Sequence, residues 1–128
     1  MRILIIITLS CLTSSGTFAQ NSLEKEFALT DSTFVKTYSL EVAKGMKQFS
    51  CRAKGRIEAG EVYFKILDPE GKQESILGLM ADTPDDNGSN IANGIMTDSF
   101  SGPLPGKWTA VLEVKSARGI FDFDIHVE

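Results

Sequence analysis

From Thr33 to the end of the chain, apolar and polar residues alternate, which is typical of β-strands with one buried side and one solvent-facing side. The pattern is clearest over 48–58 and recurs over 61–66, 107–114 and 120–127. Turn-forming residues separate the runs, and no internal repeat or heptad pattern is present. The sequence therefore predicts an all-β fold, an antiparallel β-sandwich of jelly-roll or immunoglobulin-like type with about seven strands.

The first pair of runs is predicted to form a hairpin with residues 59–60 as its loop. Its inward residues then match well across the strands, because small side chains lie opposite large ones. The outward residues match less well, since Glu58 faces Glu61 and Lys54 faces Lys65. Like charges directly opposite each other weaken this register.

The C-terminal runs are predicted to form a second hairpin, with the turn at 115–119 and Trp108 beside Val127. Both strands carry apolar residues at every second position. The segment Asp68-Pro69-Glu70-Gly71 predicts a reverse turn, because proline fixes φ at its second position and glycine tolerates the backbone that follows.

Residues 1–19 have the three parts of a secretory signal peptide. Arg2 supplies the positive start, 3–12 the apolar stretch, and Thr17-Phe18-Ala19 the small-residue cleavage site. The apolar stretch is too short to span a bilayer. We therefore expect cleavage after Ala19 and export to the periplasm or the extracellular space.

Cleavage would remove Cys11 and leave Cys51 as the sole cysteine, so no intrachain disulfide is expected. Because Cys51 lies on an inward position, a buried and inert thiol is predicted. Residues 20–32 are mostly polar and are interpreted as an N-terminal arm or a single helical turn. The β-sandwich domain is assigned to 33–128.

Two segments resemble the small secreted modules called pre-peptidase C-terminal (PPC) domains and GOLD-like domains. Residues 62–71 (VYFKILDPEG) resemble their strand followed by an Asp-Pro-x-Gly turn. Residues 106–125 resemble their closing hairpin, in which Gly-x-aromatic opens each strand. The resemblance implies a β-sandwich used for binding or interaction.

Charge and composition exclude several classes of function. The formal net charge is −4, so no basic surplus is available for a nucleic-acid backbone. The residues that common catalytic sites require are missing, because the single histidine is His126 near the C-terminus and no glycine-rich phosphate loop is present. The sequence therefore predicts a non-enzymatic protein that needs no cofactor.

Two groups of residues are candidates for ligand contact. A loop over 82–90 is rich in the oxygen ligands that calcium prefers, at the positions Asp82, Asp85, Asp86 and Asn87. Its spacing does not fit an EF-hand, and turn formation explains the same residue types. The second group is outward on the predicted strands and consists of an exposed aromatic residue and three cations, Tyr63, Arg52, Lys54 and Arg56.

These observations predict an exported binding or interaction module with an unknown protein or glycan partner. One alternative is a carbohydrate- or calcium-binding module. Another is a small periplasmic inhibitor of a hydrolase, which would insert a mobile loop, either 82–90 or 98–105, into the enzyme.

Overall fold

The computed structural model describes residues 22–81 and 91–128, and within them the chain forms five strands and no helix. The strands are β1 (Ser22–Val42), β2 (Gln48–Leu67), β3 (Gln73–Ala81), β4 (Ala92–Ser101) and β5 (Gly106–Val127). Every pairing is antiparallel. Across the described residues, no helix is long and apolar enough to cross a membrane.

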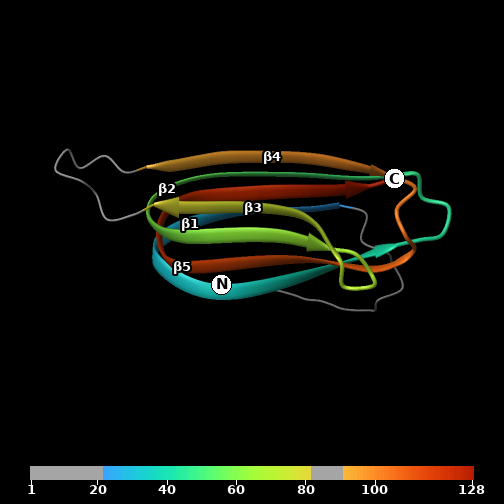
Figure 1. The fold of residues 1–128 in the computed structure, drawn as a ribbon, viewed down its shortest axis with the longest axis horizontal. Coiled ribbons are helices and arrows are strands. Elements are labelled where there is room, and N and C mark those ends of the chain that lie inside the picture. The colour runs from blue at the N-terminus through green and yellow to red at the C-terminus, as the bar shows by residue number, and fades with distance from the viewer. Residues whose placement is uncertain (1–21, 82–90) are drawn as a thin grey trace, which may run out of the picture.

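The three long strands bend near their middles, and the bends lie side by side at one end of the molecule (Figure 1). β1 shifts register between Thr30 and Phe34, and β2 shifts register against β5 between Ile57 and Glu61. At the bends Asp31 has a φ of 58° and Ser116 a φ of 48°. Each long strand therefore contributes one half to each of two packed layers.

The first layer has the order β1–β5–β2–β4. It contains residues 22–30 of β1, 118–127 of β5 and 48–57 of β2. The second layer has the order β1–β5–β2–β3 and uses the other halves of the same strands, 34–42, 106–115 and 60–67. The antiparallel β-sandwich predicted from the alternation is confirmed. Its five strands amount to eight segments, because three strands run through both layers.

Both predicted hairpins are wrong. Residues 48–67 form one strand that bends at 58–60, so Ile57 pairs with Gly119 and Val62 pairs with Val114. Residues 106–127 are likewise one strand, which bends where the second hairpin turn was expected. The chain crosses from layer to layer at these positions instead of reversing within a layer.

Two other segments differ from the sequence interpretation. From Ser22 onward, the stretch interpreted as an arm is the first half of β1, and it pairs with β5 through residue 30. Residues 98–101 belong to β4, so the first half of the segment 98–105 is strand and only 102–105 form a loop. The predicted signal peptide lies outside the described residues.

The core is formed by the inward side chains of both layers, and the predicted inward positions are correct along β2 and β5. Phe49 of the first layer stacks on Trp108 of the second, with ring centroids 4.4 Å apart. Phe64 and Phe123 make a similar contact across the layers at 4.6 Å. The buried indole nitrogen of Trp108 donates a hydrogen bond to the carbonyl oxygen of Leu104 at 2.8 Å, which satisfies its one polar atom.

Leu79 of β3 fits into a gap that two glycines leave in the first layer. A Cβ built on Gly55 would lie 2.6 Å from Leu79 Cδ1, and one built on Gly94 would lie 2.7 Å from Leu79 Cδ2. Both separations are too short for real carbon contacts, so only glycine permits this approach. The two glycines therefore set how closely β3 packs on β2 and β4.

Candidate functional site

The outer face of the first layer carries the three cations singled out in the sequence. Arg52, Lys54 and Arg56 occupy successive outward positions on β2 and are exposed. β2 is a central strand here, with β5 on one side and β4 on the other. Their side chains therefore lie in the middle of the face.

The neighbouring strands give the three cations different surroundings. Arg52 lies opposite Asp124 of β5, and Lys54 lies opposite Asp122. Arg56 has no carboxylate at either cross-strand position, because its partners are Ile120 on β5 and Asn93 on β4. Arg56 is thus the one of the three whose charge is not balanced by a directly paired residue.

A shallow depression of about 610 Å³ surrounds Arg56. Ile95 of β4 and Ile120 of β5 border it, and these residues are 59% and 58% exposed. Asn93 supplies an amide and Asp122 a carboxylate at its margin. The depression is lined by Lys54, Gly55, Arg56, Asn93, Gly94, Ile95, Ile120 and Asp122.

Arg56 is available for a ligand. The ion pairs found among the described residues join Lys65 to Glu113, Lys72 to Glu74, and Arg118 to Asp31 and Glu58. A free guanidinium presents its donors in a planar fork that matches a carboxylate or phosphate. With two isoleucines beside it, the depression can hold a ligand that combines an anionic group with an apolar part.

Tyr63 lies on the outer face of the second layer and not with the cations. Its hydroxyl donates a hydrogen bond to Glu61 Oε1 at 3.0 Å, and its ring covers Gly78 of β3. The hydrogen bond to Glu61, with burial as a smaller cause, raises the pKa of Tyr63. The sequence correctly placed Tyr63 and the cations on outward positions, but the two groups occupy opposite sides of the sandwich.

An interior polar cluster joins β3 to β4 and was not foreseen from the sequence. The Ser75 hydroxyl of β3 donates a hydrogen bond to Asp98 Oδ2 of β4. Asp98 pairs in register with Cys51, a free thiol that is 2% exposed. Burial, assisted by the charge of Asp98, raises the pKa of Cys51 to about 11. Cys51 is therefore a buried and protonated thiol, as its inward position predicted.

The predicted calcium ligands Asp82, Asp85, Asp86 and Asn87 lie outside the described residues. Calcium binding by this loop therefore stays a prediction. Within the described ranges, no three His, Cys, Asp or Glu residues are grouped so that they could hold a metal ion.

No protein-family model matches the chain, and no curated protein sequence matches it. Among solved structures, the chain is similar to a lipase from Bacillus licheniformis in its propeptide form, with a TM-score of 0.50, 15% identity and 91% of this chain covered. The chain spans 23% of that lipase chain. This likeness shows a shared β-sandwich fold.

Two further solved structures are more distant. One is the adhesin domain of Lys-gingipain from Porphyromonas gingivalis W83, at a TM-score of 0.47 and 12% identity over 84% of this chain and 73% of that one. The other is a carbohydrate-binding module from Cellvibrio mixtus lichenase 5A in complex with cellotriose. Its TM-score is 0.42 and its identity 8%, over 88% of this chain and 89% of that one. The resemblance to PPC and GOLD-like domains stays a prediction.

Proposed function

We propose that this chain is an exported, non-enzymatic binding module that holds an anionic ligand against the outer face of the first layer. The observation that carries the proposal is Arg56, a guanidinium in a depression between Ile95 and Ile120 with no carboxylate directly opposite. A charge-assisted hydrogen bond to such a group is stronger than a neutral one.

One candidate for this anionic ligand is an acidic glycan. Asn93 and Asp122 border the depression, and their amide and carboxylate can hydrogen-bond to sugar hydroxyls. In that arrangement Arg56 would hold the carboxylate of a uronic acid residue.

The proposal is tested by binding measurements with two soluble polyanions, polyglutamate and polygalacturonate, and one neutral glucan. We expect retention of at least one polyanion, no retention of the glucan, and a loss of about tenfold or more in affinity for Arg56→Ala. Arg52→Ala is the matched control, since Arg52 lies on the same strand and face but opposite Asp124. Equal losses in both variants, or no binding of either polyanion, would overturn the proposal.

A further inference from the structure

β4 is an edge strand, and its free edge differs from the other edges of the sandwich. β4 pairs with β2 alone among the described strands and runs along one margin of the molecule (Figure 1). An edge strand presents unpaired N–H and C=O groups that can accept a further strand. Proteins normally obstruct such edges with lysine, proline, bulges or inward charges.

The edge formed by β1 is obstructed in this way. Lys25 and Lys36 occupy interior-side positions of β1 at the open margin between the layers. Lys25 Nζ lies 5.7 Å from the ring centroid of Tyr38, and Lys36 Nζ lies 5.5 Å from that of Phe27. A strand added to β1 would have to desolvate these ammonium groups, and the bend at Asp31 interrupts the ladder.

The edge formed by β3 is shorter and irregular. β3 has 9 residues, and its ladder with β2 shifts register between Ile66 and Leu67 because Glu74 is an additional residue on β3. Such a bulge twists the edge away from further pairing. Glu74 also adds a carboxylate beside the irregularity.

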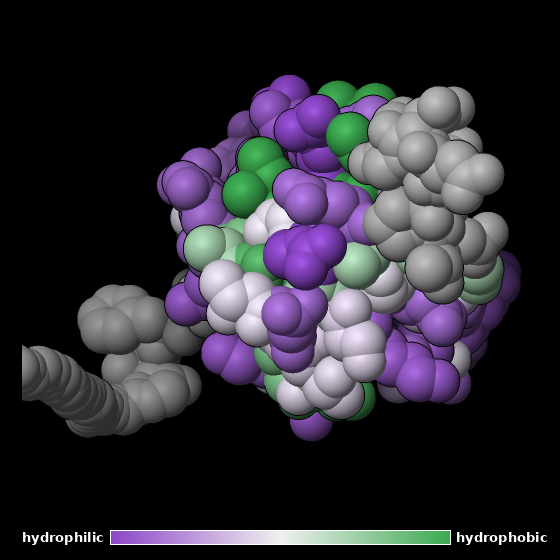
Figure 2. Space-filling model, turned by 90° about the vertical axis from the view of Figure 1, so that its left-hand side faces the viewer, coloured by the Kyte–Doolittle hydropathy of each residue, from purple (hydrophilic) through white to green (hydrophobic). Residues whose placement is uncertain are grey.

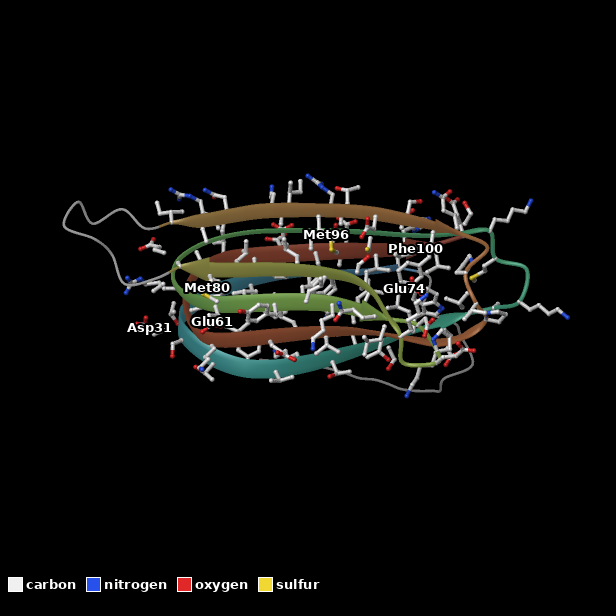
Figure 3. All side chains as sticks on the ribbon, viewed as in Figure 1. Asp31, Glu61, Glu74, Met80, Met96 and Phe100 are labelled. Carbon is white, nitrogen blue, oxygen red and sulfur yellow. The ribbon has the colours of Figure 1, made fainter. Side chains whose placement is uncertain are left out.

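By contrast, β4 lacks lysine, proline and a bulge, and the one obstruction of this kind that it carries is an inward charge, Asp98. Its 10 residues, ANGIMTDSFS, contain no lysine, arginine or proline. Its ladder with β2 runs from Gln48–Ser101 to Ile57–Ala92 without a register shift. The one charged residue, Asp98, already accepts a hydrogen bond from Ser75. Met96 and Phe100 lie on the inward side of β4, where an added strand could pack (Figure 3).

The positive charge of Arg56 beside β4 indicates which side chains an added strand would carry. Arg56 of β2 is the cross-strand partner of Asn93 of β4. A residue of an added strand that paired with Asn93 on its other side would therefore lie two strand spacings, about 10 Å, from Arg56. An arginine and an acidic side chain can bridge that separation over the short Asn93. A second copy of this chain would bring no acid, because the outward residues of β4 are Asn93, Ile95, Thr97, Ser99 and Ser101.

From this geometry we infer that β4 accepts an extended acidic peptide of a partner protein as an added strand, with an acidic side chain on Arg56. The inference rests on the proposed anionic site and names its ligand. The peptide would alternate apolar residues, which pack beside Met96 and Phe100, with acidic residues on the outer face. Backbone hydrogen bonds to β4 would supply affinity, and Arg56 would supply the preference for acid.

The test measures fluorescence anisotropy with labelled ten-residue peptides of alternating valine and glutamate, or of alternating valine and lysine. We expect the glutamate peptide to bind at least about tenfold more tightly, and Arg56→Glu to reverse this preference. Arg52→Glu is the matched control and should retain the preference. Because these side chains are outward and exposed, circular dichroism is expected to show both variants folded.

Backbone pairing is tested with two N-methylated forms of the glutamate peptide, methylated at alternate residues in opposite phase. An added edge strand directs every second N–H towards β4 and the others to solvent. One form should therefore lose binding and the other keep it, whereas equal behaviour would overturn strand addition.

The remaining outcomes separate the two proposals. Binding of polygalacturonate that depends on Arg56, with no binding of the peptide, would overturn the peptide inference and leave the anionic site standing. Dimerisation of the free protein that the peptide cannot displace, measured by analytical ultracentrifugation, would show that a second copy occupies the edge. Binding of neither probe would overturn both proposals.

Discussion

The carbonyl oxygen of Ser116 lies directly over Gly60, at the point where β5 and β2 bend together from one layer into the other. A Cβ built on Gly60 would overlap this oxygen. The Ser116 N–H donates a hydrogen bond to Thr33 Oγ1 at 2.9 Å, which joins the bend of β5 to that of β1. Arg118 adds ion pairs to Glu58 at 3.4 Å and to Asp31 at 3.6 Å. The three bends therefore form one connected structure at the end of the molecule that Figure 2 faces, where hydrophilic, neutral and hydrophobic residues are mixed.

Gly60→Ala is expected to destabilise the protein more than the same change at Gly71. Both glycines have positive φ, 84° and 85°, so both variants should lose about 1 kcal/mol or more from backbone strain. Nothing lies within 4 Å of a Cβ on Gly71, whereas Gly60 meets Ser116. We therefore expect an additional loss of about 1–3 kcal/mol for Gly60→Ala in urea denaturation. Equal losses would show that the contact with Ser116 relaxes freely.

The buried thiol of Cys51 should make the fold less stable at alkaline pH. Its pKa is about 11 in the folded chain against an ordinary value of 9.0, so the unfolded chain releases the proton first. Stability from this group is present below pH 9 and is lost progressively as the pH rises through 9 towards 11. The loss amounts to at most about 3 kcal/mol. We expect Cys51→Ala, although less stable at pH 7, to show a smaller further loss between pH 8 and 10.

The same burial predicts slow chemical modification of Cys51. A thiol reagent at pH 8 should label the folded protein slowly and the urea-unfolded protein quickly. Rapid labelling under native conditions, at the rate of a small free thiol, would contradict the buried position.

The hydrogen bond from Ser75 to Asp98 should contribute measurably to stability, because it joins β3 and β4 at the margin between the layers. Ser75 is 6% exposed. Ser75→Ala leaves the half-buried carboxylate of Asp98 without this donor, so we expect a loss of about 1–3 kcal/mol in the free energy of unfolding. Ser39→Ala, at an exposed position on β1, is the control and should change stability by less than about 0.5 kcal/mol.

The fit of Leu79 against Gly55 predicts strongly non-additive substitutions. Gly55→Ala should overfill the interior and cost about 1–3 kcal/mol, and Leu79→Ala should leave a cavity and cost about 2–5 kcal/mol. In the double variant the added methyl group no longer meets Leu79, although Phe121 Cδ1 still lies 2.8 Å from it. We expect the combined loss to be smaller than the sum by at least about 1 kcal/mol in a double-mutant cycle, and additive losses would contradict the contact.

The alternation in the sequence predicts the side of each strand on which a residue lies, but not the direction of the chain. Trp108 and Phe123 are buried as predicted, although they belong to one strand and not to two arms of a hairpin. A hairpin turn and a bend between layers both place the flanking apolar residues inward. Periodicity alone therefore cannot distinguish them.

One feature of the sequence favoured the bend. The predicted hairpin placed Glu58 against Glu61 and Lys54 against Lys65, which makes two unfavourable pairs of like charge. In the folded chain Lys54 lies opposite Asp122, and Lys65 forms an ion pair with Glu113 at 3.3 Å. The mismatch of charges was evidence against the reverse turn.

The special position of Arg56 could not be predicted from the sequence. Arg52, Lys54 and Arg56 are equivalent by alternation, and only the register with β4 and β5 shows which of them faces an acid. That register joins segments far apart in the chain, so no local pattern contains it. The same reason explains why the contact between Ser75 and Asp98 was not foreseen.

The three bent strands have a consequence for how the domain comes apart. Because β1, β2 and β5 run through both layers and the two layers share one core, melting of one layer would expose the inward side chains of the other. The domain should therefore open as a single cooperative unit, with hydrogen exchange in both halves of β5 governed by the same global unfolding event.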